Sequence, residues 1–349
     1  MEKVRIGFVG VGAMGQCAHL KNFAVVPGCE VVAIAEIREK LGEMVARKYG
    51  VPNVYKNHTE MLAAEKLDAI VASQPFTRHG VLVPDLLKAG IPILTEKPLA
   101  GSVRVGEKII KAVSESGTWH MLGYHKRSDP AVMYAKATIN ALKETGELGP
   151  MRYVRILMPE GDWIANGFAD LVKCDGPQPE LEFDPAAEDM DEATYKLYIS
   201  FVNYYIHQVN MMRHILGEPY EVTYADPSQV VMGVRSSSGI SGTIEMSPYR
   251  TTIDWQESIL VCFKYGYVKI NLPAPLAARP GTVEIFKDPG NGATPQTIIP
   301  QLPNIPAMRQ QAANFISAVK GEMEPLCNSL EALDDLKVAR DYIKLLKGV

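Results

Sequence analysis

The chain has 349 residues, 47% of them hydrophobic and 22% charged, which is typical of a globular protein large enough for two domains. Its formal net charge of −4 provides no basic field, so we expect neither nucleic acid nor a membrane surface as a partner. The five cysteines are scattered without a C-x-x-C pair, and neither a signal peptide nor an apolar run of membrane-spanning length is predicted. Together these features favour a reducing, cytoplasmic location.

The first 36 residues predict a dinucleotide-binding unit. Residues 4–9 are short, apolar and rich in β-branched side chains, which indicates a buried strand. A G-x-G-x-x-G motif at 10–15 follows, then apolar residues at helical spacing, then a second buried strand at 30–35. Such a motif by itself can be a simple glycine turn, but its place between strand and helix favours a pyrophosphate site at a helix N-terminus.

Two residues after the second strand bear on the choice of coenzyme. Glu36 follows the motif by about 20 residues, where an acidic side chain accepts hydrogen bonds from the adenosine ribose. Its carboxylate would repel a 2′-phosphate, which favours NAD. Arg38 could accommodate that phosphate, or it could be a solvated residue at the start of the next helix. We therefore expect NAD, with NADP the less favoured coenzyme.

Strands and helices alternate through the rest of the first half. Periodicity predicts helices at 38–49, 79–89 and 103–116, and buried strands at 67–73, 92–95 and 119–124. This alternation indicates an α/β fold with a Rossmann doubly wound parallel sheet. Ligands bind outside the carboxyl ends of such strands, and these ends hold residues 10–15, Glu36, 73–76, 96–98 and 124–127.

The second half has a different pattern, with a predicted domain boundary near Gly123. Helices are expected at 131–144, 195–216, 306–319 and 329–346, and a strand at 151–159. Alternating runs between 221 and 299 favour antiparallel strands. Residues 174–194 are rich in Pro, Asp and Glu, which is typical of a solvated loop, although a lid or a subunit arm would also fit. We expect a coenzyme domain at 1–123 and a substrate and oligomerisation domain at 124–349.

Several motifs together resemble the glucose–fructose oxidoreductase, inositol dehydrogenase and MocA (Gfo/Idh/MocA) family. They are the glycine motif, SQPFTRH at 73–79, TEKPLA at 95–100 and GYHKRSDP at 123–130. The resemblance implies a Rossmann domain followed by an α/β domain with a large, open, mostly antiparallel sheet. It also implies NAD(P)-dependent chemistry on sugars, cyclitols and their derivatives. The open face of the sheet commonly joins subunits, so we expect a homodimer or homotetramer.

The resemblance also assigns roles to residues. It implies a phosphate turn and an adenosine loop, formed by Gly10, Gly12, Ala13, Met14, Ser73, Gln74, Pro75 and His79. Glu96 and Lys97 would border the nicotinamide, with Lys97 as the catalytic lysine. Arg127 would lie near nicotinamide and substrate, and His207 would face the nicotinamide from a helix of the second domain.

The sequence departs from the family pattern beside this histidine. Asn203 and Asn210 stand where many sugar and cyclitol dehydrogenases carry aspartate. Positions i, i+4 and i+7 share a helix face, so both amides could lie beside His207. Asparagine can orient an imidazole but supplies no negative charge, so His207 should be less readily protonated than in those relatives. His207 could also be a hydrogen-bonded core residue.

The chemistry expected is the interconversion of a secondary alcohol and a ketone. Burial and a cationic nicotinamide ring both disfavour the charged form of Lys97, which makes it a reasonable base. His207 would assist and Asn203 would orient it. Tyr124, Arg127, Trp163 and Tyr204 are further substrate candidates, although Trp163 could simply pack in the core. No zinc-site spacing is present, so no metal is expected.

Three functions remain open. The favoured one is an NAD-dependent oxidoreductase acting on a sugar, glycoside, cyclitol or sugar acid. The second is an enzyme that keeps a tightly bound NAD(P) and recycles it through paired oxidation and reduction. The third is a nucleotide-sensing regulatory protein that has kept the fold and lost catalysis, against which the retention of Lys97 and His207 argues.

Overall fold

A computed structural model describes residues 3–176, 180–290 and 292–348 of the chain. The predicted loop at 174–194 and both predicted domains therefore include a few residues outside the described part. The chain divides into two compact units. The first comprises Met1–Tyr124, Asn166–Tyr195 and Met308–Leu336, and the second comprises His125–Ala165, Lys196–Ala307 and Lys337–Val349.

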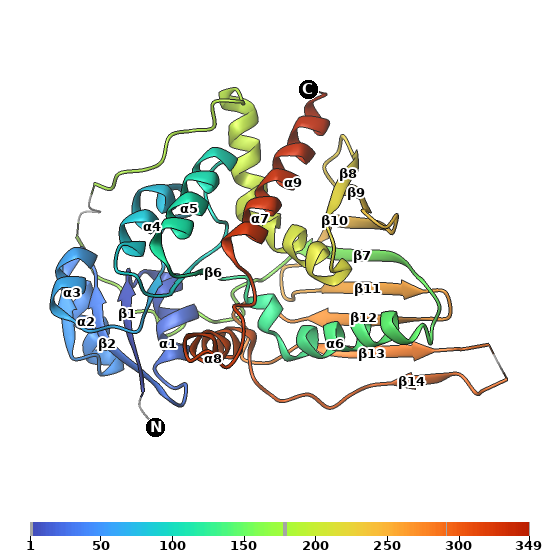
Figure 1. Ribbon diagram of the computed structural model, residues 1–349, viewed down its shortest axis with the longest axis horizontal. Coiled ribbons are helices and arrows are strands. Elements are labelled where there is room, and N and C mark those ends of the chain that lie inside the picture. The colour runs from blue at the N-terminus through green and yellow to red at the C-terminus, as the bar shows by residue number, and fades with distance from the viewer. Residues whose placement is uncertain (1–2, 177–179, 291, 349) are drawn as a thin grey trace. The chain divides into compact units, whose positions relative to one another are not determined.

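The first unit is built on a six-stranded parallel sheet with the order β3-β2-β1-β4-β5-β6. Figure 1 labels β1, β2 and β6 of this sheet. Its strands are β1 (Val4–Val9), β2 (Cys29–Ala35), β3 (Asn53–Tyr55), β4 (Ala69–Ala72), β5 (Ile93–Thr95) and β6 (His120–Leu122). The order reverses at β1, which is the topological switch point where such sheets bind ligands. The prediction of a Rossmann-type sheet is confirmed.

Helices connect these strands. They are η1 (Gly15–Leu20), α1 (Lys21–Phe23), α2 (Glu39–Tyr49), α3 (His58–Ala64), η2 (Phe76–Arg78), α4 (His79–Leu87) and α5 (Val103–Ser116). The predicted helix after the glycine motif is present, and its middle part, η1, is π-helical. The prediction lacks β3 and α3. Strand β3 has only three residues, all half-buried, so it shows little strand pattern. Helix α3 could have been predicted, because Asn57 caps it by accepting from the Glu60 N–H at 2.9 Å and this Asn-x-x-Glu spacing is visible in the sequence.

The core of this unit includes a helix from far along the chain. Helix α8 (Ala307–Val319) contributes Phe315, which is fully buried. Its ring packs edge-on against Phe23 at 5.9 Å and Trp119 at 5.6 Å between ring centroids. Edge-to-face aromatic pairs of this kind add to the burial energy of the rings. A helix distant in sequence therefore completes the core beneath β1.

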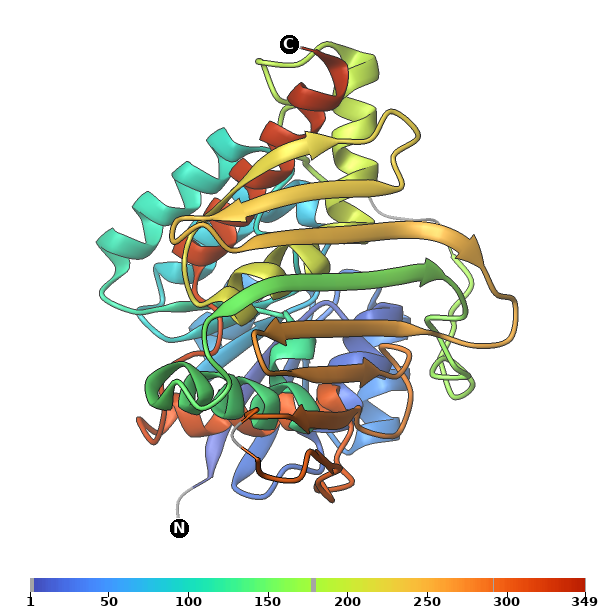
Figure 2. The ribbon, with the colours of Figure 1, turned by 90° about the vertical axis from the view of Figure 1, so that its right-hand side faces the viewer.

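The second unit is built on an eight-stranded sheet with the order β14-β13-β12-β11-β7-β10-β9-β8 (Figure 2). The strands are β7 (Met151–Glu160), β8 (Tyr220–Ala225), β9 (Val231–Ser236), β10 (Ser241–Arg250), β11 (Glu257–Phe263), β12 (Gly266–Leu272), β13 (Thr282–Lys287) and β14 (Gln296–Ile298). All pairings are antiparallel except that of β7 with β10. The expectation of a large, mostly antiparallel sheet is confirmed, while β14 was not predicted.

One face of this sheet is buried and the other is not. Val154 and Ile156 of β7 are fully buried, whereas Arg155 and Leu157, which alternate with them, remain partly exposed. Helix α6 (Pro130–Thr145) packs along β12 and β13 (Figure 1). The remaining helices are η3 (His125–Ser128), α7 (Glu192–Leu216) and α9 (Ser329–Lys347). No helix among the described residues is long and apolar enough to cross a membrane.

Candidate coenzyme and substrate sites

The glycine motif has the shape that a pyrophosphate requires. Gly10 has a φ of 87°, and a Cβ there would come within 2.6 Å of the Ser73 carbonyl oxygen. A Cβ on Gly15 would lie 2.5 Å from the Gly10 carbonyl oxygen, so the turn and the helix pack too closely for a side chain. A Cβ on Gly12 would instead meet, among the described atoms, only Arg38 Nη2 at 3.9 Å. The space above Gly12 is open, which fits the close approach of a dinucleotide phosphate.

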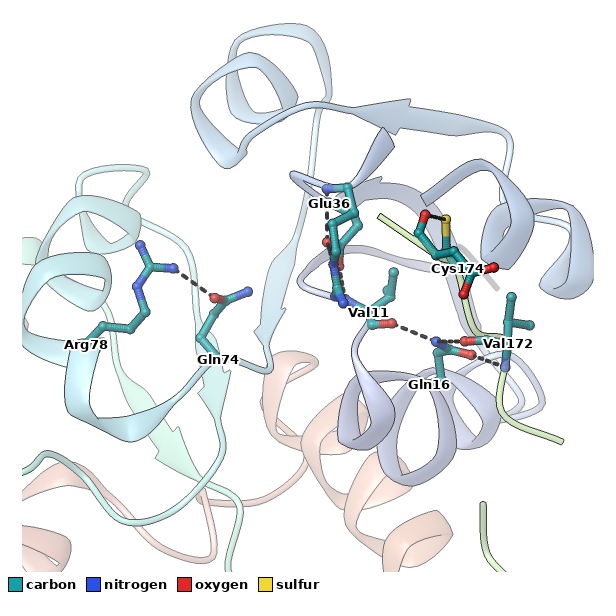
Figure 3. A network of polar contacts seen from close by, with 9 residues as sticks. Val11, Gln16, Glu36, Gln74, Arg78, Val172 and Cys174 are labelled. Carbon is teal, nitrogen blue, oxygen red and sulfur yellow. Dashed lines mark hydrogen bonds and ion pairs between the residues drawn. The ribbon is translucent and has the colours of Figure 1, made fainter. Parts of the chain in front are cut away.

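Glu36 is held in place by the chain itself (Figure 3). Its carboxylate is 3% exposed and accepts from the Val11 N–H at 2.9 Å. It accepts three more hydrogen bonds from Arg38, from the backbone N–H at 3.1 Å, Nε at 2.7 Å and Nη2 at 3.1 Å, which makes four in all. Hydrogen bonding to Glu36 raises the pKa of Arg38. Because a carboxylate offers about four lone-pair positions, a ribose hydroxyl would have to share or displace one of these donors.

The loop after β4 lies beside the glycine turn but differs in exposure along its length. Gln74 is half-buried and accepts from Arg78 Nη1 at 2.8 Å (Figure 3), and Pro75 is exposed. His79 is fully buried, with Nδ1 at 3.1 Å from the Leu99 carbonyl oxygen, and burial lowers its pKa. A direct contact of His79 with the coenzyme therefore stays a prediction.

The Glu96–Lys97 pair after β5 is tied to the helix that follows the glycine motif. Glu96 Oε1 lies 2.6 Å from Nε2 of His19, a buried residue of η1. Glu96 Oε2 accepts from the Lys97 backbone N–H at 3.2 Å, and the Lys97 side chain is half-buried. Sequence reasoning missed His19. Its contact joins positions 77 residues apart, so no local pattern could have found it.

In the second unit, η3 and α7 bring predicted residues together. Arg127 is 2% exposed and donates through Nε to Asn210 Oδ1 at 2.7 Å. The ring of His207 packs edge-on against that of His125, with centroids 4.7 Å apart and an interplanar angle of 80°. Asn203 lies on the same helix but is exposed. Asn210 therefore holds Arg127, and His125 is a neighbour of His207 that sequence reasoning missed, although it lies within the quoted GYHKRSDP motif.

Aromatic side chains form a second cluster in this unit. Trp163 and Tyr204 are both half-buried and pack against Met158, Trp255 and Ala274. Burial raises the pKa of Tyr204 to about 12, so its hydroxyl stays protonated near neutral pH. The two substrate candidates Trp163 and Tyr204 thus join one cluster, while Tyr124 lies in the first unit, just after β6, and is 3% exposed. Across the described residues, no three His, Cys, Asp or Glu side chains gather as metal ligands would.

Known proteins resemble this chain in sequence and in fold. Residues 4–124 match a family model described as an oxidoreductase family with an NAD-binding Rossmann fold. Over 248 residues the chain is 29% identical to a scyllo-inositol 2-dehydrogenase (NAD(+)) of Bacillus subtilis, covering 70% of this chain and 68% of that protein. It is 31% identical over 140 residues to an inositol 2-dehydrogenase of Rubrobacter xylanophilus, covering 40% of each. A solved oxidoreductase domain protein from Kribbella flavida has a TM-score of 0.74 at 17% identity, covering 100% of this chain and 98% of that one.

A parallel sheet whose glycine turn leaves room for a pyrophosphate is suited to a dinucleotide, and the match over residues 4–124 is to a family of NAD-binding oxidoreductases. Residues 4–124 thus match the model of the Gfo/Idh/MocA oxidoreductase family, the family that the motifs of the sequence resemble.

Proposed function

We propose that the protein is an NAD-dependent dehydrogenase that interconverts a secondary alcohol and a ketone on a polyhydroxylated substrate, with an inositol or related cyclitol the first class to test. The observation that carries the proposal is the open space above Gly12 beside the Glu36–Arg38 pair, in a chain that is 29% identical to an NAD(+)-dependent inositol dehydrogenase. Sugars, glycosides and sugar acids remain within the same class. In this proposal residues 1–123 bind NAD and residues 124–349 bind substrate in the cytoplasm.

The proposal gives each of these residues a role. The turn Gly10–Met14 and the Glu36 carboxylate would hold the phosphates and the adenosine ribose. NAD, when bound, supplies the hydride acceptor. Lys97 would accept the hydroxyl proton during oxidation and return it during reduction. His207 would assist, Arg127 would bind substrate hydroxyls or coenzyme, and Trp163 would stack on the C–H face of the ring.

Replacing Lys97 tests this proposal. In Lys97→Ala, kcat/KM for a substrate of the parent enzyme should fall by about 10²–10⁴-fold, the usual contribution of a general acid–base group. The substrate comes from a screen of inositols, sugars and glycosides with NAD⁺ and NADP⁺ in parallel. Lys88→Ala, which removes an exposed lysine paired with Asp85, is the control and should match the parent. Undiminished turnover by a folded Lys97→Ala variant would remove Lys97 from the mechanism.

A second candidate function is retention of the coenzyme with internal recycling. It is favoured by hydrogen bonds that join the segment Asn166–Tyr195 to residues just after the glycine motif and just after the loop that follows β4. Gln16 exchanges two hydrogen bonds with the Val172 backbone, at 3.0 and 3.1 Å. Asp184 accepts from the Gly80 N–H at 2.9 Å. A denatured sample that releases about one NAD per chain would support retention, and its absence would favour free exchange.

We also propose that the protein is a homodimer or homotetramer joined through the partly exposed face of the eight-stranded sheet. Leu157 and Leu260 lie on this face among polar side chains, and partly exposed apolar residues in a sheet are suited to a second copy of the chain.

A further inference from the structure

A buried carboxylate at the start of β11 collects donors from three parts of the second unit. Glu257 is 1% exposed. It accepts from Lys126 Nζ at 2.6 Å, from Gln208 Nε2 at 2.7 Å and from Trp255 Nε1 at 3.1 Å. Lys126 is itself 4% exposed and Gln208 is fully buried. The carboxylate therefore connects η3, α7 and the strand on which it lies.

The donors are chain neighbours of residues proposed for proton transfer and for binding. Lys126 stands between His125 and Arg127, and Gln208 directly follows His207. His125 packs on His207, and Arg127 donates to Asn210, also of α7. Three consecutive residues of η3 are thus fastened to α7, two directly and Lys126 through Glu257. The backbone that carries His207 is held from one side by this arrangement.

Burying the charges of Lys126 and Glu257 costs free energy. Burial lowers the pKa of Lys126, and the charge of Glu257 and its hydrogen bond oppose that shift. Buried ion pairs seldom stabilise a fold more than apolar residues of similar volume would, whereas removing one partner leaves an uncompensated charge. The Lys126–Glu257 pair is therefore better explained by the geometry that it imposes than by a contribution to the free energy of folding.

We propose that Glu257 is a positioning residue, which keeps η3 and α7 in register so that His207 and His125 hold their orientation. This inference rests on the proposed function, in which His207 assists proton transfer. Glu257 itself does not need to touch substrate or coenzyme.

The first test replaces the carboxylate by its isosteric amide. Glu257→Gln should lower kcat for the substrate by about tenfold or more. The dissociation constant for NAD should change by less than about twofold, because the residues proposed to hold the phosphates and the adenosine ribose belong to the first unit. The double variant Lys126→Met, Glu257→Gln removes the unpaired cation as well. We expect the double variant to have the melting temperature of the parent, whereas its kcat should stay as low as that of Glu257→Gln. Recovery of kcat together with the melting temperature would mean a purely structural role and would overturn the proposal.

A second measurement does not depend on activity. Imidazole ¹H–¹⁵N NMR signals of His207, assigned with a His207→Asn variant, should move in Glu257→Gln. They should stay in place in Glu147→Gln, which removes an exposed ion pair with Lys287, 2.8 Å long, in the same unit. A parent that oxidises no polyol would contradict the proposed function. Unmoved His207 signals in Glu257→Gln would contradict this inference alone.

Discussion

Glu36 is the side chain that we propose to set the choice of coenzyme. The sequence placed an acid and an arginine two residues apart and left their relation open. The structure pairs them, with Arg38 Nε and Nη2 both donating to the Glu36 carboxylate at 2.7 and 3.1 Å. The guanidinium charge is thereby directed at the carboxylate, which leaves less positive charge for a 2′-phosphate. This geometry explains in physical terms why NAD is the expected coenzyme.

Neutralising that carboxylate should relax the preference. In Glu36→Gln, the repulsion of a 2′-phosphate is removed and Arg38 is released, so the ratio of kcat/KM with NAD⁺ to that with NADP⁺ should fall about tenfold or more, since a hydrogen bond to a charged group contributes roughly 1.5–3 kcal/mol. Steady-state kinetics with both coenzymes measure the ratio. Glu39→Gln, at an exposed position in the first turn of α2, is the control. An unchanged ratio in Glu36→Gln would contradict the assignment.

At the scale of one element, helix α6 begins at a buried carboxylate. Asp129 caps the helix by accepting from the Ala131 N–H at 2.8 Å and also accepts from the Gly281 N–H at 3.1 Å. It is 1% exposed, and burial raises its pKa to about 6 against the lowering effect of these amides. The native state therefore holds the Asp129 proton at pH values where the unfolded chain, with an ordinary pKa near 3.9, has lost it.

This difference in pKa sets the direction in which the free energy of unfolding changes with pH. The contribution of Asp129 to stability is complete below about pH 4 and is lost as the pH rises through about 6. Between these values the free energy of unfolding of the parent should fall, relative to Asp129→Asn, by roughly 3 kcal/mol at most. Denaturant titrations from pH 4 to 7 measure it, with the exposed Asp175→Asn as the control. Parallel pH curves for parent and Asp129→Asn would refute the expectation.

At the scale of the whole molecule, the partly exposed sheet face is the surface proposed to join subunits. Leu260 of β11 pairs in register with Arg155 of β7 and Lys269 of β12, so an apolar side chain lies between two cations. An arginine at this position would place a charge in an interface and remove apolar area from it. The same substitution should cost the isolated subunit little, because Leu260 is only partly buried.

We therefore expect Leu260→Arg to reduce the molar mass of the proposed homodimer or homotetramer without a large change in melting temperature. Light scattering coupled to gel filtration measures the molar mass. Met44→Arg, at another partly exposed apolar position, in α2, should keep the parent's mass. A parent that is already monomeric, or a Leu260→Arg variant of unchanged mass, would rule out this interface.

Much of the architecture could be predicted from local patterns. The strand before the glycine motif, helix α5 and the mostly antiparallel second sheet follow from periodicity, turns and caps, which involve residues a few positions apart. Short elements such as β3 and β14 were missed because three residues carry too little pattern. The parallel pairing of β7 with β10 was missed because a strand's own sequence does not specify its distant partner.

The sequence by itself determined the Rossmann motif, the acid that follows it and the family, since each depends on residue types at short, fixed spacing. Only the tertiary structure decided that His19 contacts Glu96, that His125 packs on His207, and that Lys126 meets Glu257 across 131 residues. The physical reason is the range of the interactions. Turns and helices are encoded by neighbouring residues, whereas a buried side chain finds its partner only when the core closes around both.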